Sequence, residues 1–228
     1  MIEAVIFDID GTIVDSNEFH VRAWDRAFRR FGKEFPLEEL RQQIGKGADQ
    51  YLPEFLSPEE VQTIGKKIDQ HRSELYRKEY LPVVRPFPKV RQLFERIKRE
   101  GKRIALASSG KNQELKVYKK IAQIEDLIDS ATTSDDADKS KPAPDIFEAA
   151  LEKLGNPSPH KLVAVGDTPY DAEAAKKVGV STIGVLCGGF SAEQLRQAGM
   201  IALYRDPADL LEHYDQSPLV SRAFDDRS

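Results

Sequence analysis

The chain has 228 residues, 32% of them charged, and a formal net charge of −4. This length predicts one or two domains with a substantial core, and the mild acidity argues against a general nucleic-acid binder, which would present a basic face. The single cysteine, Cys187, excludes an intrachain disulfide bond and disfavours a cysteine-rich zinc site.

The first predicted element is a buried strand at residues 4–7, where apolar residues run without alternation, and Gly11 ends the segment. Asp8 and Asp10 follow the strand directly, at the edge of an open α/β sheet where ligands bind. Two carboxylates about 4 Å apart repel by about 4 kcal/mol at an effective dielectric constant near 20. We therefore expect the pair to need a divalent cation or a shared proton, rather than merely to cap a helix.

Residues 16–84 show helical spacing of apolar side chains and no strand pattern. Val21, Trp24, Phe28 and Phe31, for example, would share one face of a helix. The segment is too long for a single crossover helix between two strands. It predicts an inserted helical cap domain at 16–84, with a core domain formed by 1–15 and 85–228.

Further strands are predicted at 103–107, 128–132, 162–165 and 181–185, with a sixth at 201–204. Amphipathic helical patterns separate them, and strands that alternate with helices predict an α/β fold. We expect a three-layer, Rossmann-like parallel sheet with helices on both faces. Asp206 is expected to begin a last helix, and the polar segment after Ser217 is expected to fray.

Polar clusters follow three of the later strands. Ser108 and Ser109 come after the strand at 103–107, just before a helix predicted to start around Lys111. Hydroxyls, backbone N–H groups and a helix N-terminus together favour an anion site. Lys141 precedes Pro142, which stiffens the backbone and allows a fixed ammonium group to meet a phosphate.

The third cluster contains Asp167 and, four residues later, Asp171, a spacing that places both at the start of one helix. Asp167 is expected to complete a hard-oxygen magnesium site with Asp8 and Asp10. Asp171 is expected to orient Lys141 or a metal-bound water. Each cluster alone is also typical of a helix cap or a solvated loop, so the inference depends on their combination.

In this order the clusters resemble the motifs of the haloacid dehalogenase superfamily of phosphohydrolases. The first motif is matched by Asp8-Ile9-Asp10-Gly11-Thr12, the second by Ser108, the third by Lys141 and the fourth by 166–171. The resemblance covers nearly the whole chain, including a helical cap inserted after the first motif. It is greatest for the branch with phosphoglycolate phosphatases and β-phosphoglucomutases.

This resemblance implies that Asp8 is a nucleophile that forms an aspartyl-phosphate. It implies that Asp10 is first a general acid and then a general base, which requires neighbours that raise its pKa. Mg²⁺ is the implied cofactor, bound by the Asp8 carboxylate, the Asp10 backbone carbonyl and the Asp167 carboxylate.

The remaining roles implied by the resemblance concern phosphate and substrate. Ser108, Ser109 and Lys141 would hold the phosphoryl oxygens, and Lys141 also counts among the catalytic residues. Thr12 and Asp171 would support the site. From the cap, His20 would face the active site, and Lys46, between two glycines, would meet a second anionic group of the substrate.

The leading hypothesis is a Mg²⁺-dependent phosphatase that acts on a small phosphate monoester, of the phosphoglycolate or sugar phosphate type. A β-phosphoglucomutase-like mutase is the nearest alternative, but that branch usually has adjacent Glu-Asp in the fourth motif, where this chain has Gly166-Asp167. A receiver-like signalling module would lack the helical insert and the second acid. A dehalogenase would not use Asp10, and no cap lysine suits a phosphonate hydrolase.

The sequence also bears on location and partners. No secretory signal is expected, because Met1 leads straight into the first strand, and no apolar stretch is long enough to cross a bilayer. We expect a cytoplasmic monomer or homodimer whose partner is a small phosphorylated metabolite, and neither a membrane nor nucleic acid.

Overall fold

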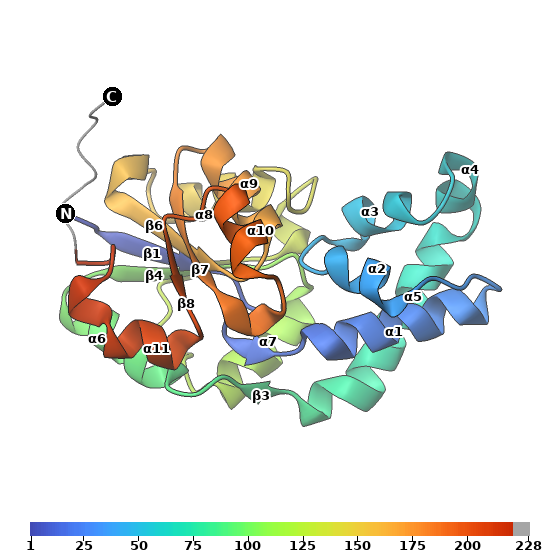
Figure 1. Ribbon diagram of the computed structural model, residues 1–228, viewed down its shortest axis with the longest axis horizontal. Coiled ribbons are helices and arrows are strands. Elements are labelled where there is room, and N and C mark those ends of the chain that lie inside the picture. Colours follow the sequence, from blue (N-terminus) through green and yellow to red (C-terminus); the bar gives the residue numbers. More distant parts are fainter. Residues whose placement is uncertain (221–228) are drawn as a thin grey trace.

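The computed structural model describes residues 1–220, and its centre is a six-stranded parallel sheet (Figure 1). The strand order is β5-β4-β1-β6-β7-β8. The strands are β1 Ala4–Phe7, β4 Arg103–Ala107, β5 Ser130–Thr132, β6 Leu162–Gly166, β7 Ser181–Val185 and β8 Ala202–Tyr204. This sheet confirms the predicted Rossmann-like α/β core. β5 starts later than predicted, and just before it the Asp129 carboxylate, rather than a backbone carbonyl, accepts the N–H of Ile104 at 2.7 Å.

Helices cover both faces of the sheet, and β1 shows why. Its side chains alternate, so Val5 and Phe7 pack in one apolar cluster while Ala4 and Ile6 pack in another. The first cluster includes α6 Val90–Arg99, α7 Asn112–Ile121 and α11 Pro207–Glu212. The second includes α8 Asp145–Lys153 and α9 Pro169–Lys177, and α10 Ala192–Gln197 packs against α9.

A second group of helices lies beyond one end of the sheet (Figure 1). These are α1 Asn17–Arg30, α2 Leu37–Gln42, α3 Ala48–Tyr51, α4 Pro58–Glu60 and α5 Lys66–Leu75. They have an apolar cluster of their own, in which the Trp24 ring stacks on Tyr51 with centroids 4.4 Å apart. We call this group of helices the cap, and the sheet with the helices that cover it the core. A cap domain bounded at 16 and 84 remains a prediction, although this separate cluster supports it.

A two-stranded antiparallel ribbon joins the two groups. It pairs β2 Val14–Asp15 with β3 Arg85–Pro86 and was not predicted, because two-residue strands leave no hydropathy pattern. The ribbon brings the outgoing and returning chains side by side, so the long helical excursion starts and ends at one place.

The prediction of fraying after Ser217 is wrong for the three described residues that follow it, 218–220. Leu219 is fully buried in the large apolar cluster, and the Ser217 hydroxyl donates to the Tyr214 carbonyl at 2.6 Å. The rest of that segment, 221–228, lies outside the described residues. Within residues 1–220, no helix combines the length and apolarity that a membrane crossing needs.

Candidate active site

The register of the sheet gathers the predicted motifs at one edge. Phe7 of β1 pairs with Leu106 of β4 on one side and Val165 of β6 on the other. The residues that follow these strands therefore meet at the carboxyl edge, and they include Asp8, Ser108 and Asp167. The backbone N–H of Asp8 still donates to the Val165 carbonyl at 2.9 Å, which fixes the start of the loop.

Lys141 is fully buried and lies between two acids. Its Nζ is 2.5 Å from Asp8 Oδ1 and 2.7 Å from Asp171 Oδ1, and it donates to the Ala107 carbonyl at 2.7 Å. Burial alone would lower the pKa of Lys141, but the charges of Asp171 and Asp8 raise it well above its usual range. The ammonium group therefore stays charged beside the Asp8 carboxylate.

Three buried carboxylates form a cluster that includes both acidic partners of Lys141. Asp8, Asp167 and Asp171 each offer one oxygen, and these atoms all lie within 4.8 Å of one another. Burial raises the pKa of Asp8 to about 7, against the opposing charge of Lys141, and burial together with the charge of Asp8 also raises the pKa of Asp167. One ammonium cannot balance three carboxylates, and oxygen donors suit a hard divalent cation, so these residues fit Mg²⁺.

The Asp167 carboxylate is held from both sides. Thr12 Oγ1 donates to its Oδ1 at 3.0 Å, and Asn17 Nδ2 donates to its Oδ2 at 2.8 Å. Asn17 also donates to the Gly188 carbonyl at 2.8 Å, and a Cβ on Gly188 would come within 1.7 Å of Asp167 Oδ2. Thr12 thus contacts an acid of the site directly, and its supporting role remains a prediction. Asn17 also contacts this acid, and sequence reasoning missed it.

The Asp10 side chain contacts the cap rather than the cluster of three buried carboxylates. Its Oδ1 accepts from the Ser16 hydroxyl at 2.6 Å and lies 2.9 Å from His20 Nε2. The expectation of a raised pKa for Asp10 is wrong here: burial would raise it, but His20 and the hydrogen bond from Ser16 lower it below the usual value. The His20 ring in turn stacks on Tyr76, with centroids 3.9 Å apart.

The two predicted phosphate-binding serines differ in what their hydroxyls contact. Ser108 is buried, and its Oγ accepts from the Gly110 N–H at 3.0 Å. Ser109 lines the pocket above Asp8, and its Oγ is buried without a hydrogen-bond partner among residues 1–220. A ligand oxygen could therefore accept from Ser109, next to α7, whose first helical residue is Asn112.

Similarity to known proteins identifies the family of this chain. Residues 5–185 match the family model described as haloacid dehalogenase-like hydrolase. The chain belongs to this family. A phosphorylated carbohydrates phosphatase of Thermotoga maritima is 28% identical over 92% of this chain and 96% of its own length. A phosphoglycolate phosphatase of Aquifex aeolicus is 30% identical over 81% of this chain and 84% of its own.

A solved structure with a similar fold agrees with this assignment. A hydrolase from Pseudomonas syringae superposes with a TM-score of 0.85 at 26% identity, over 96% of this chain and 100% of its own. The high coverage in both directions means that the likeness includes the cap helices as well as the sheet.

In this haloacid dehalogenase-like hydrolase the cap is seated on the core. The Gly47 N–H donates to Ser140 Oγ at 2.8 Å, and the same hydroxyl donates to Asp49 Oδ1 at 2.6 Å. Tyr170 donates to the Gln42 carbonyl at 2.5 Å. Between cap and core lies a pocket of about 510 Å³, its open mouth included, lined by side chains from both parts.

His20 and Lys46, the two predicted cap residues, both line this pocket, but their side chains have different partners. His20 reaches Asp10, as described above. Lys46 Nζ donates to Glu54 Oε1 at 2.7 Å and to Gln43 Oε1 at 2.6 Å, and it lies 4.7 Å from the centre of the Tyr170 ring. The cap itself therefore supplies acceptors for the Lys46 ammonium.

Two charged residues in the pocket were missed by sequence reasoning, namely Arg72 of α5 and Glu114 of α7. A signal was present, because each occupies a position on an otherwise apolar helix face. Arg72 is four residues after the buried Ile68, and Glu114 is four residues before the buried Tyr118.

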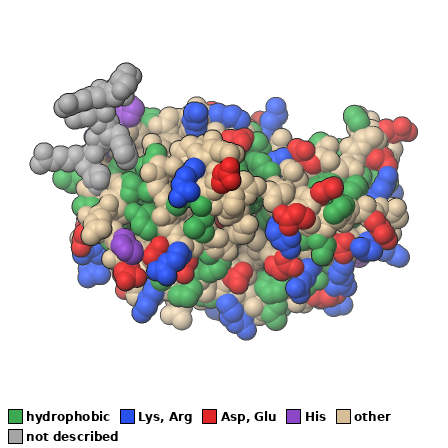
Figure 2. Space-filling view, viewed as in Figure 1, with side chains coloured by type: hydrophobic (Ala, Val, Ile, Leu, Met, Phe, Trp, Pro, Cys, Tyr) green, Lys and Arg blue, Asp and Glu red, His purple; other side chains and the backbone are tan. Residues whose placement is uncertain are grey.

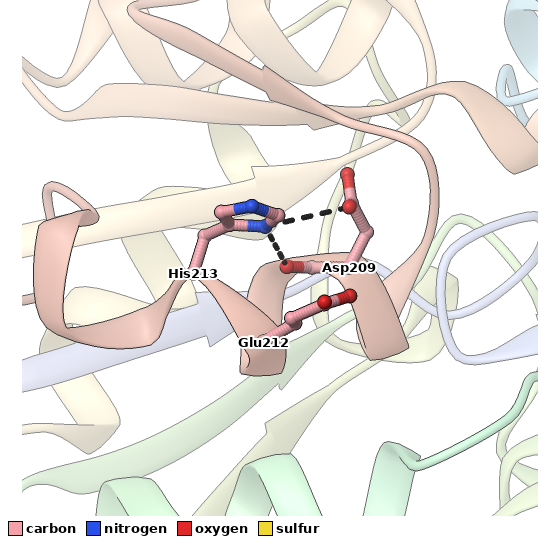
Figure 3. Close-up of side chains that lie close together, drawn as sticks. All are labelled: Asp209, Glu212 and His213. Atoms are coloured by element: carbon pink, nitrogen blue, oxygen red, sulfur yellow. Dashed lines mark hydrogen bonds and ion pairs between the residues drawn. The ribbon is translucent and has the colours of Figure 1, made fainter.

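A second group of potential metal ligands lies on α11, far along the chain from the motifs (Figure 3). It consists of Asp209, Glu212 and His213. His213 Nδ1 contacts the Asp209 backbone carbonyl at 3.0 Å and its carboxylate at 3.4 Å, and Arg205 contacts the same carboxylate at 2.7 Å. These contacts pair Asp209 with residues that flank α11 on either side, so we assign the group no function.

The surface carries both signs of charge. On the face shown in Figure 2, Lys and Arg side chains are interspersed with Asp and Glu over the core and the cap. This pattern agrees with the mildly acidic composition of the chain.

Proposed function

We propose that this chain is a cytoplasmic Mg²⁺-dependent phosphatase that hydrolyses a small phosphate monoester through an aspartyl-phosphate on Asp8. The observation that carries the proposal is the buried Asp8 carboxylate at 2.5 Å from Lys141 Nζ, with the Asp10 side chain in the same pocket. Relatives named as phosphatases of phosphorylated carbohydrates and of phosphoglycolate support it.

In the first step, an Asp8 carboxylate oxygen forms a bond to phosphorus while the bond from phosphorus to the ester oxygen breaks. Asp10 Oδ2 gives a proton to the departing oxygen, so the product leaves as an alcohol. Because His20 and Ser16 lower the pKa of Asp10, this step requires the negative charge of the bound phosphoryl group to raise that pKa, so that Asp10 enters the step protonated. Lys141, charged and fixed by Asp171, neutralises the attacking carboxylate and the phosphoryl oxygens. The Ser109 hydroxyl donates to a phosphoryl oxygen.

In the second step, a water oxygen forms a bond to phosphorus and the bond to Asp8 breaks, which releases inorganic phosphate. Asp10 takes the proton from that water and is ready to act as an acid again. His20 and Ser16 hold the Asp10 carboxylate in place for both transfers. The seated cap limits the access of bulk water while the ester is bound.

Asp8 and Asp167, with the Asp10 carbonyl, would hold Mg²⁺, and Asp171 lies close enough to share in the site. When bound, the ion would neutralise the carboxylates and the charge of the transferring phosphoryl group.

Asn17→Ala should raise the Mg²⁺ concentration for half-maximal activity by about 10–100-fold, because Asp167 would lose a hydrogen bond that orients it. A Mg²⁺ titration of phosphate release measures this effect. Gln197→Ala is a matched control, since Gln197 is exposed and, among residues 1–220, its side chain hydrogen-bonds only to Glu193. An unchanged titration in the folded Asn17 variant would remove Asn17 as a positioning residue.

The proposed function is tested by phosphate release from a panel of sugar phosphates, phosphoglycolate, nucleotides and p-nitrophenyl phosphate, with Mg²⁺ and with EDTA. We expect Mg²⁺-dependent release from at least one small ester. If the protein releases phosphate from none of them, the proposal is wrong.

A mutase is the second candidate, and the contact between His20 and Asp10 favours it because the histidine couples the cap to the acid. Solved structures of similar fold include a putative β-phosphoglucomutase from Thermotoga maritima, 26% identical with a TM-score of 0.67. The same panel separates the candidates, since a mutase would isomerise a sugar phosphate without net release of phosphate. A stable phosphoprotein without turnover would instead indicate a receiver-like module.

A further inference from the structure

The pocket that contains Asp8 and Asp10 is also lined by two charged side chains that the mechanism does not use. Arg72 reaches it from α5 in the cap, and Glu114 reaches it from α7 in the core. Both side chains belong to buried residues, with exposed fractions of 9% and 2%. A buried charge that faces a pocket is expected either to have a partner within the protein or to bind a ligand.

Arg72 has only part of its donor capacity satisfied. Its Nη2 donates to Asp69 Oδ1 at 2.8 Å, and its guanidinium lies 4.9 Å from the centre of the Trp24 ring. Its Nε is buried and has no hydrogen-bond partner among residues 1–220. The guanidinium is thus held in place by Asp69 and Trp24 with one N–H left for an acceptor on a ligand.

Glu114 is the complementary case. Among the described residues, no side chain forms a hydrogen bond or an ion pair with its carboxylate, although Arg72 is close enough for the Glu114 charge to raise the pKa of Arg72, against the effect of burial. A carboxylate accepts hydrogen bonds and does not donate them. It therefore calls for donors on the ligand, and hydroxyl groups are both donors and acceptors.

The charges of the residues around this pocket disfavour a second anionic group on the substrate. Lys46 is paired with Glu54. Arg72 and Lys111 both contact the Asp69 carboxylate, so the nearby Glu114 balances the second of these two positive charges. A carboxylate or a second phosphate next to Glu114 would meet like-charge repulsion, and these described residues leave no positive charge in excess to offset it.

We infer that Arg72 and Glu114 form a subsite for the hydroxyl groups of an uncharged leaving group, so the substrate is a sugar or polyol phosphate rather than phosphoglycolate or pyrophosphate. This inference rests on the proposed phosphatase function and narrows its substrate class. It replaces the expectation that Lys46 meets a second anionic group.

The first test compares kcat/KM of the unmodified full chain, with Mg²⁺, for ribose 5-phosphate, glucose 6-phosphate, sorbitol 6-phosphate, phosphoglycolate and pyrophosphate. We expect the highest value for one of the three hydroxylated esters. A higher value for phosphoglycolate or pyrophosphate overturns this inference and leaves the phosphatase function intact. Hydrolysis of none of these, nor of p-nitrophenyl phosphate, overturns both.

The second test changes Glu114 to Gln, which keeps the size of the side chain but removes its charge and one strong acceptor. The ratio of kcat/KM for the best hydroxylated ester to that for phosphoglycolate should fall at least about tenfold, mainly through KM. Glu125→Gln, an exposed residue just beyond the same helix, should leave the ratio unchanged. An unchanged ratio in a folded Glu114 variant contradicts the subsite.

A third variant covers the case in which Glu114→Gln does not fold. Arg72→Lys keeps the positive charge but lacks the unpartnered Nε, so KM for the hydroxylated ester should rise at least about fivefold. Circular dichroism establishes that the variant is folded. A KM equal to that of the unmodified chain overturns the role of Arg72.

Discussion

Replacing Asp8 by asparagine is expected to lower kcat by at least about a thousandfold on every phosphate ester that the chain hydrolyses. The amide is a far weaker nucleophile than the carboxylate, and the Lys141 ammonium would no longer face a negatively charged attacking oxygen at position 8. Steady-state phosphate release, with enzyme concentration raised to detect residual turnover, measures the effect.

The Asp8→Asn variant is expected to stay folded, because asparagine has nearly the same shape and Lys141 keeps its contacts with Asp171 and the Ala107 carbonyl. Thermal unfolding followed by circular dichroism checks this. Asp138→Asn is a suitable control, since Asp138 is exposed on the loop before Lys141. Activity within about tenfold of the unmodified chain, in a folded variant, would remove Asp8 as the nucleophile.

Replacing Asp10 by asparagine is expected to lower kcat/KM by about 10²–10⁴ for alkyl phosphates, since the alkoxide would leave without a proton. The loss should be markedly smaller for p-nitrophenyl phosphate, whose phenolate leaves more readily. The comparison therefore tests proton donation rather than general damage to the site. The variant should also accumulate phosphoenzyme, because it lacks the base for the second step.

Equal losses on both classes of ester would contradict the acid role of Asp10 and indicate a merely structural one. Ser16 and His20 provide the physical reason for expecting a folded variant, because both can still hydrogen-bond to the Asn side chain.

Much of the fold could be predicted because its signals are local. The strands at 4–7 and 103–107 are apolar runs, interrupted only by Arg103 at the start of the second, and the structure has them at the predicted bounds. The ribbon of β2 with β3 could not be predicted, since its two-residue strands are specified by where the cap leaves and rejoins the core. The buried Leu219 was missed because an isolated leucine in a polar segment carries no periodicity.

The part of the site that could be predicted is the part whose residues directly follow parallel strands. Residues that follow β1, β4 and β6 must meet at the carboxyl edge, so the proximity of Asp8 and Asp167 follows from sequence order. Contacts across the cap do not follow from that order. The lowered pKa of Asp10 depends on how α1 places His20, and the pairing of Lys46 with Glu54 depends on the fold of the cap.

The central claim, phosphoryl transfer to Asp8, is tested most directly by trapping. The protein is mixed with Mg²⁺ and its preferred ester, quenched in acid during turnover, digested and examined by mass spectrometry. We predict one added phosphoryl group on the peptide containing Asp8, absent from Asp8→Asn and more abundant in Asp10→Asn. Turnover without any phosphorylated peptide, or with the phosphoryl group on another residue, would contradict the mechanism.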